Sequence, residues 1–404
     1  MLTRRELLIL TVESTVFAQE NTVNSNTQRR IAQIIGAYEQ QGNHRTATEV
    51  DRISGDWLAD EVSKCGLKPS RENFTIDRVV PVATVLSVEG RRIDGIPLFD
   101  GGFTDAAGVS GQLGALGSDA PIGLTEIAPN TAGAGALMEA RRQNRHRAIV
   151  VVTRGGRPGL CPSNAENFLH PFGPPVLQVS SQEAGALGDL AKRGAEVSLF
   201  TRVSRTRAEA FNVVSRVRGA NPALPPLVIM TPRSGWWSCA SERGGGIACW
   251  LELMRVMRKE KPARDVIFIA SSGHELGQLG IEIHTERRPE LIKGSRAWIH
   301  FGANVGAAQD PGNTIQASDD EMENAMSAPI IAAGLTINRR VPRGTIPGGE
   351  AGVIHRGGGR YMSIIGRNAL FHNPADHGPQ AIDPGVIARF ATAFTAIART
   401  LAGA

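Results

Sequence analysis

In the second half of the chain, apolar residues form short continuous runs that alternate with segments of helical spacing. The runs have the composition of buried strands and lie at 227–231, 265–271, 297–301 and 361–366. A further strand is predicted before them, at 213–218. Apolar residues at helical spacing predict helices over 244–259, 276–287 and 384–401. Strands that alternate with helices favour an α/β fold with a mainly parallel, mixed sheet sandwiched between helices.

The residue composition changes twice along the first half of the chain. Helices are predicted over 28–41 and 49–65, and strands follow over 71–88. Gly and Ala then become frequent, and short apolar runs stand between loops. These runs lie at 148–152 and 175–179, before a predicted helix over 182–193 and a strand-like stretch at 195–200. We therefore expect a β-rich insert over 85–205 within a main domain built from 19–84 and 206–404.

Length and charge restrict the classes of function. A chain of 404 residues is long enough for two or three domains, and 41% hydrophobic with 21% charged residues is typical of a globular protein. The net charge of +5 is spread along the chain with no basic run, which argues against nucleic-acid binding. No apolar stretch approaches the roughly 18 to 20 residues that span a bilayer.

The amino terminus has the features of an export signal. Arg4 and Arg5 precede an apolar region over 7–16, and Ala18 suits a small-residue cleavage site. This pattern predicts removal of residues 1–18 and a periplasmic or secreted protein. Glu13 interrupts the apolar region, so an ordinary amphipathic helix is the alternative.

The four cysteines lack the close spacing of a metal site. A bridge between Cys239 and Cys249 is conceivable in an oxidising compartment. Buried free thiols are the interpretation we prefer.

Polar side chains gather where the predicted strands end. Glu242 precedes the helix over 244–259, Glu275 follows the strand over 265–271, and His372 follows the last strand. Ligands of open α/β sheets bind outside the carboxyl ends of the strands. Two carboxylates and one imidazole form a three-ligand set for zinc that leaves a position open for water.

Three segments resemble the leucyl aminopeptidase and glutaminyl cyclase family of zinc hydrolases. Gly273-His-Glu-Leu-Gly-Gln-Leu-Gly280 is similar to the family's Gly-Glu-Glu-Leu-Gly-Leu-Leu-Gly. Phe371-His-Asn-Pro-Ala-Asp376 is similar to Tyr-His-Thr-Pro-Ala-Asp, and 240–246 is similar to a loop that precedes a helix. The segment 43–80 resembles the family's N-terminal element. The insert resembles a protease-associated domain.

The resemblance implies a zinc site that is only partly retained. The family's ligands for one zinc ion correspond to Glu242, Glu275 and His372. The positions for a second ion hold Pro232 and Gly302, which cannot bind metal. The resemblance therefore implies one zinc per chain at most, as in glutaminyl cyclases. A chain that binds no zinc is the alternative.

The catalytic Glu of the family is replaced by His274, whose reference pKa of about 6.5 suits a general base. His300, on the strand at 297–301, lies two residues before Gly302. Its side chain therefore points to the same face of the sheet as the missing ligand would. Further candidates for metal or substrate contacts near the strand ends are Arg233, Trp236, Trp237, Arg243 and Asp376. Ser234 or Cys239 with His274 is a metal-free alternative.

Three hypotheses about function follow from these residues. The first is a zinc-dependent hydrolase of an amide or peptide-like bond with His274 as the general base. The second is a non-hydrolytic enzyme on the same site, which cyclises its substrate or transfers an acyl group. The third is a metal-free binding protein that has lost catalysis. The expected partner is a small-molecule or peptide-like substrate, and the sequence does not indicate the oligomeric state.

Overall fold

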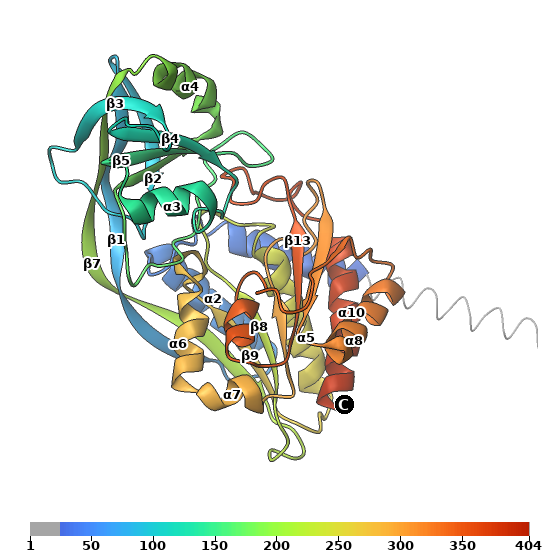
Figure 1. Ribbon diagram of the computed structural model, residues 1–404. Helices are drawn as coiled ribbons and strands as arrows, with labels where there is room; N and C mark the ends of the chain where they lie inside the picture. Colours follow the sequence, from blue (N-terminus) through green and yellow to red (C-terminus); the bar gives the residue numbers. More distant parts are fainter. Residues whose placement is uncertain (1–24, 404) are drawn as a thin grey trace, which may run out of the picture.

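The main sheet runs in the order β7-β9-β8-β10-β13-β11-β12 and is seen in the lower right half of Figure 1. The computed structural model describes residues 25–403. Parallel pairing joins β9 (Val266–Ser271), β8 (Leu227–Pro232), β10 (Ala297–Phe301) and β13 (Tyr361–Arg367). Antiparallel pairing adds β7 (Glu196–Val217) on one side and β11 (Gly312–Ala317) on the other, with β12 (Arg339–Arg340) outermost. The predicted fold class is confirmed.

Helices cover both faces of this sheet. One face packs against the helix over 25–39 and against α2 (Glu49–Lys64), α5 (Gly244–Lys259), α8 (Asp320–Ala332) and α10 (Pro384–Ala402). The other face packs against α6 (Leu279–Arg287), α7 (Pro289–Gly294) and α9 (Ala351–Arg356). Side chains on both faces of the parallel strands are buried, which explains their continuous apolar runs.

The start of α5 is pressed against the loop after β10. A Cβ on Gly245 would lie 1.8 Å from the carbonyl oxygen of Val305, so only glycine allows this approach. This contact fixes the preceding residues, among them Glu242, at the carboxyl ends of the parallel strands.

The remaining strands close into a ring. Their order is β1-β2-β6-β5-β4-β3-β7, and β1 also pairs with β7. The ring strands are β1 (Ser70–Val88), β2 (Arg91–Pro97), β3 (Val109–Ala115), β4 (Ile122–Ile127), β5 (Ala148–Thr153) and β6 (Val176–Ser180). Its helices are α3 (Gly135–Gln143) and α4 (Ala184–Lys192). Apolar side chains from β1 to β7 and α4 form a separate core inside it.

Two long strands join the ring to the main sheet. Figure 1 shows β1 and β7 running together from the central sheet into the ring, and they pair antiparallel from Ser70 to Ser87. The sequence predicted separate strands at 195–200 and 213–218, but β7 continues through both. The polar stretch between them remains a strand because β1 supplies its hydrogen-bond partners. The domain boundaries at 84/85 and 205/206, and the protease-associated type of the insert, stay predictions.

The last helix, α10, is long and apolar enough to span a bilayer, although no such stretch was expected from the sequence. By length and composition, α10 could cross a bilayer, since it has 19 residues and a mean hydropathy of 1.2. However, 56% of that window is buried, and α10 packs against α5 and α8. Core helices of globular domains have the same properties.

All four cysteines are free, as preferred, with Cys161, Cys239 and Cys249 buried and Cys65 partly so. The predicted export signal at 1–18 lies outside the described residues.

Candidate functional site

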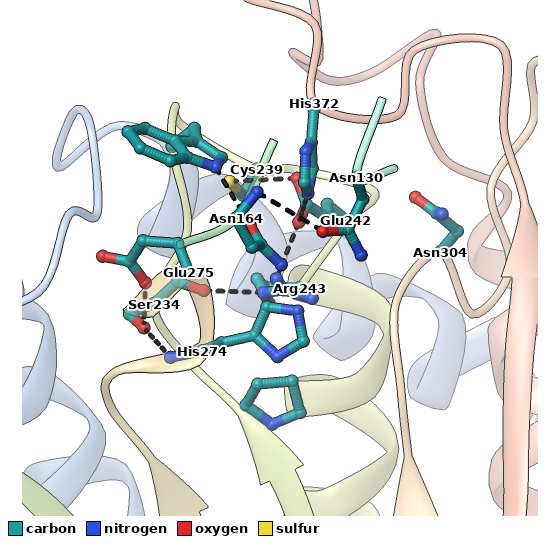
Figure 2. A network of polar contacts seen from close by, with 12 residues as sticks. Asn130, Asn164, Ser234, Cys239, Glu242, Arg243, His274, Glu275, Asn304 and His372 are labelled. Atoms are coloured by element: carbon teal, nitrogen blue, oxygen red, sulfur yellow. Dashed lines mark hydrogen bonds and ion pairs between the residues drawn. The ribbon is translucent and has the colours of Figure 1, made fainter. Parts of the chain in front are cut away.

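Loops that follow the parallel strands meet at one edge of the sheet, which we call the rim. Glu242 lies just before α5, and Arg243 is the N-cap residue of that helix. The pair His274 and Glu275 lies in a 3₁₀ turn, η2 (His274–Leu276), directly after β9. Figure 2 shows these side chains together with that of His372, which follows β13.

Glu242 and His372 form a buried pair at the rim. The His372 Nε2 atom lies 3.3 Å from Glu242 Oε1, and both side chains are at most 1% exposed. The His372 Nδ1 atom lies 2.5 Å from the Pro162 carbonyl oxygen and donates to it. Both ring nitrogens therefore face oxygen acceptors. These two members of the predicted zinc set are brought together.

The guanidinium of Arg243 binds the same carboxylate. Its Nη2 atom lies 2.7 Å from Glu242 Oε1, and its Nε atom donates to the Ser234 carbonyl oxygen over 2.7 Å. Burial alone would raise the pKa of Glu242, but Arg243 and then His372 outweigh it and hold that pKa far below its usual range. Glu242 is therefore ionised and already has a cationic partner.

Glu275 points away from this pair. Figure 2 shows its carboxylate beside Ser234, on the opposite side of Arg243 from His372. Its Oε1 atom accepts from the Thr46 amide at 2.6 Å, and its Oε2 atom accepts from the Ser234 hydroxyl at 2.8 Å. Burial raises the pKa of Glu275, against the effect of these two hydrogen bonds. Both oxygens that would bind a metal already have protein partners.

The donor set at the rim does not fit the predicted zinc site. Among residues 25–403, no group of three or more His, Cys, Asp or Glu side chains is arranged to hold a metal ion. The position of Gly302 has no room for a ligand, because a Cβ there would lie 2.7 Å from Ile365 Cγ1 and 3.0 Å from His300 Cε1. Glu242 and His372 alone provide two ligands, and structural zinc sites need four protein ligands and catalytic sites three.

A second buried cluster lies beneath the first, and its central residue was missed. The Glu350 carboxylate, at the N-cap of α9, lies 2.9 Å from His274 Nδ1 and 3.1 Å from His300 Nε2. The His300 Nδ1 atom in turn lies 2.7 Å from Ser363 Oγ. Burial opposes ionisation of Glu350, but His274 and His300 outweigh it and lower its pKa far below the usual range.

The sequence held a signal for Glu350 that was not used. It follows Gly348-Gly349, and a Cβ on Gly349 would lie 3.0 Å from His300 Cε1. Glycine there lets the loop approach both imidazoles. A carboxylate directly after a glycine pair is therefore the sequence signal for a partner of the two histidines.

The other predicted residues hold the rim together. Arg233 binds Asp51 Oδ1 at 2.7 Å and is fully buried, so it is not free to bind substrate. Asp376 accepts from the amides of Ser241 and Glu242, both at 3.0 Å, and so orients the turn before α5. The indole of Trp236 donates to Asn164 Oδ1 at 3.0 Å, and that of Trp237 donates to the His372 carbonyl oxygen at 2.8 Å.

A segment of the chain between β5 and β6 covers the rim. The Pro162 carbonyl binds His372, the Asn164 side chain binds Trp236, and the Ala165 amide donates to the Glu275 carbonyl oxygen at 2.8 Å. These contacts leave His274 6% exposed and Glu242 1% exposed. They could not be predicted, because they depend on how the ring sits against the main sheet.

Comparison with solved structures identifies the fold. The zinc aminopeptidase from Bacillus subtilis superposes with a TM-score of 0.76 at 17% identity, over 93% of this chain and 94% of that one. A peptidase precursor from Shewanella amazonensis gives 0.69 at 16% identity, over 94% and 97%. The glutaminyl cyclase from Porphyromonas gingivalis gives 0.51 at 12% identity, over 92% and 98%.

No protein-family model and no curated protein sequence matches the chain. The structural neighbours confirm the resemblance drawn from the three motifs: the chain has the fold of zinc aminopeptidases and glutaminyl cyclases. At these identities the likeness concerns the fold alone, so the chemistry has to be argued from the side chains.

Proposed function

We propose that this protein is a hydrolase of an amide or peptide-like bond in which His274 is the general base. The fold supports this proposal, since its neighbours are peptidases. The observation that carries it is the buried pair of His274 and Glu350, with 2.9 Å between Nδ1 and Oε1. A carboxylate that orients an imidazole is a recurring arrangement of hydrolytic sites.

Glu350 fixes the tautomer of His274. Because the carboxylate accepts a hydrogen bond from the Nδ1–H group, the Nε2 atom keeps its lone pair and can take a proton from water. A base positioned in this way contributes roughly 10² to 10⁴ in rate. Since His300 holds the other oxygen of Glu350, the carboxylate cannot turn away from His274 without breaking a second contact.

A buried guanidinium that is paired with Glu242 and, within residues 25–403, keeps one free N–H group belongs to the same site. Arg243 is fully buried, and its Nη1 atom has no hydrogen-bond partner among the described residues. A preorganised cation beside a reacting carbonyl stabilises the negative charge that develops on its oxygen. In our proposal Arg243 has this role.

Zinc on Glu242, Glu275 and His372 was the sequence-based prediction, and we derive no step through it. Binding would require Glu275 to leave Thr46 and Ser234, and Arg243 to leave Glu242.

The same contacts favour a second candidate, a metal-free binding protein, because the family's ligands are engaged by other side chains. Cyclisation or acyl transfer at this site remains a third prediction, since one structural neighbour is a glutaminyl cyclase.

The test is turnover of a panel of aminoacyl and acyl amides by the full chain purified without chelators. We expect kcat to fall at least 100-fold in His274→Ala. In Glu350→Gln we expect a fall of about 10-fold or more with KM retained, because Glu350 positions the base and does not touch substrate. The exposed His170 provides the matched control, since His170→Ala should leave both constants unchanged.

Metal content measured by mass spectrometry on the same samples decides between the candidates. We expect far less than one zinc per chain. About one zinc per chain, lost in Glu275→Ala, would restore the zinc site and contradict the proposal that Glu242, Glu275 and His372 hold no metal. Turnover without uptake of isotopically labelled water would indicate the cyclase or acyl transferase. If the wild-type protein turns over none of these amides, the metal-free binding protein is the remaining candidate.

A further inference from the structure

A cavity lies between the turn before α2, strand β1 and η2. Its volume is about 180 Å³, and neither His274 nor Glu242 lines it. Its lining comes from segments far apart in the chain: Arg45, Thr46 and Thr48, the β1 residues Ile76, Arg78, Val79 and Val80, and Phe99, Phe168, Glu275 and Leu276. The main sheet and the ring therefore both contribute to it.

Most of the cavity wall is apolar. Ile76, Val79, Phe99, Phe168 and Leu276 are each at most 8% exposed and belong to one cluster of packed side chains. An apolar cavity of about 150 Å³ is large enough to hold benzene. This cavity can therefore enclose one aromatic ring or one branched aliphatic group.

Two arginines line the same cavity without a carboxylate partner. Within residues 25–403, neither Arg45 nor Arg78 forms an ion pair, whereas the fully buried Arg141, Arg233 and Arg243 each do. Arg78 donates through Nη1 to the Ala47 carbonyl oxygen at 2.7 Å, and its buried Nε atom has no hydrogen-bond partner. Both arginines are half-buried. Cations that are withdrawn from water are normally paired, so these two lack an anion.

The charges in the cavity support the same conclusion. Burial lowers the pKa of Arg45, Glu275 opposes this effect, and Arg78 adds to it. Two arginines and a single carboxyl group, that of Glu275, line the cavity, so it stays positive even when Glu275 is ionised. Glu275 also has both oxygens engaged by Thr46 and Ser234, and it does not bind either arginine.

We propose that this cavity binds a carboxylate that carries one aromatic or branched aliphatic group. The carboxylate lies between Arg45 and Arg78, where planar guanidinium groups can pair with both oxygens. The apolar group fills the space between Phe99, Phe168 and Ile76. This inference goes beyond the proposed hydrolase, because it concerns binding at a cavity that the His274 and Glu350 cluster does not line.

Two sources offer this chemistry, a free organic acid and the carboxyl-terminal residue of a peptide. Isothermal titration of the full chain separates them, with phenylpropionate as one probe and a tripeptide ending in phenylalanine as the other. The amides of both probes are the controls for charge. Tighter binding of phenylpropionate assigns a free acid, and tighter binding of the tripeptide assigns a chain end. Either result supports the site.

We expect each amide to bind at least 10-fold more weakly than its acid. Arg45→Gln should weaken binding of the acid by a similar factor, and Arg142→Gln, on an exposed arginine of α3, should not change it. Val80→Trp fills the cavity and should abolish binding, with the melting temperature as the check that it folds. His274→Ala should bind like the wild type, which distinguishes this site from the proposed catalytic one.

Equal affinity for acid and amide would overturn the proposal. So would wild-type affinity in both Arg45→Gln and Val80→Trp. Neither result would bear on the hydrolase, whose test is turnover.

Discussion

At the scale of single residues, Arg243 is the cation that compensates the buried charge of Glu242. Their contact of 2.7 Å lies where water does not reach, and His372 lies 3.3 Å from the same oxygen. Removing one partner of a buried pair leaves the other charge uncompensated, which costs more than the pair itself contributes.

Replacing Arg243 should therefore destabilise the protein strongly. We expect Arg243→Met to lower the free energy of unfolding by about 3–5 kcal/mol. The double variant Glu242→Gln/Arg243→Met should recover a large part of this loss, because no unpaired charge remains. Urea denaturation followed by fluorescence measures both effects. The exposed Arg202 provides the control, Arg202→Met, which should change stability by less than about 0.5 kcal/mol. Losses that simply add in the double variant would contradict this account.

Residue identity predicted part of the site. Glu242 and His372 were expected together, because carboxyl ends of parallel strands meet at one edge of the sheet. The direction of Glu275 was not predictable, because it depends on the Thr46 amide and the Ser234 hydroxyl, which are remote in sequence. The contacts of Glu350 depend in the same way on how the loop before α9 returns to the rim.

At the scale of elements, the caps decide where several helices begin. The Asp319 side chain accepts from the Met322 amide at 3.0 Å and starts α8, although Pro329 lies inside that helix. Asp383 caps α10 in the same way. The sequence predicted α10, whose apolar period is strong, and missed α8, where Pro329 and three acidic residues in the first turn hide the pattern.

Loss of the α8 cap should be measurable. We expect Asp319→Ala to lower the free energy of unfolding by about 1 kcal/mol, since substitution of N-cap residues by Ala typically costs that much. Asp320→Ala is the matched control, because Asp320 is exposed and forms a surface ion pair with Arg343, and such pairs contribute little. Thermal and urea unfolding measure the difference. Equal losses in the two variants would show that the cap does not stabilise α8.

Among the strands, continuous apolar runs were sufficient to locate β8, β9, β10 and β13 within about one residue. Apolar runs did not locate the polar middle of β7, because its strand conformation comes from pairing with β1 and not from its own composition.

At the scale of the whole molecule, stability should depend on pH through His44. This residue is buried, its ring stacks on Tyr38 at 3.8 Å, and its Nε2 atom has no hydrogen-bond partner. Burial lowers the pKa of His44 from 6.5 to about 3 in the folded protein. The unfolded chain therefore binds a proton between pH 6.5 and about 3 that the folded chain rejects.

The stability that His44 supports is fully present above pH 6.5 and is lost as pH falls toward 3. The slope of the free energy of unfolding against pH contains a contribution from His44 of at most about 1.4 kcal/mol per pH unit. We expect His44→Gln to remove this part of the slope, and urea denaturation at several pH values measures it. His170→Gln, on an exposed histidine, should keep the slope of the wild type. A slope unchanged by His44→Gln would assign the acid sensitivity to other groups.

The closed ring has a consequence for assembly. Every strand from β1 to β7 has a neighbour on both sides for at least part of its length, although β1 pairs with β7 alone from Ser70 to Thr84. Among the described strands, the sheet ends at β12, which consists of the exposed residues Arg339 and Arg340. An edge this short and positively charged is a poor template for a strand of another chain. The short, charged edge at β12 therefore protects the end of the main sheet against edge-to-edge pairing with another chain.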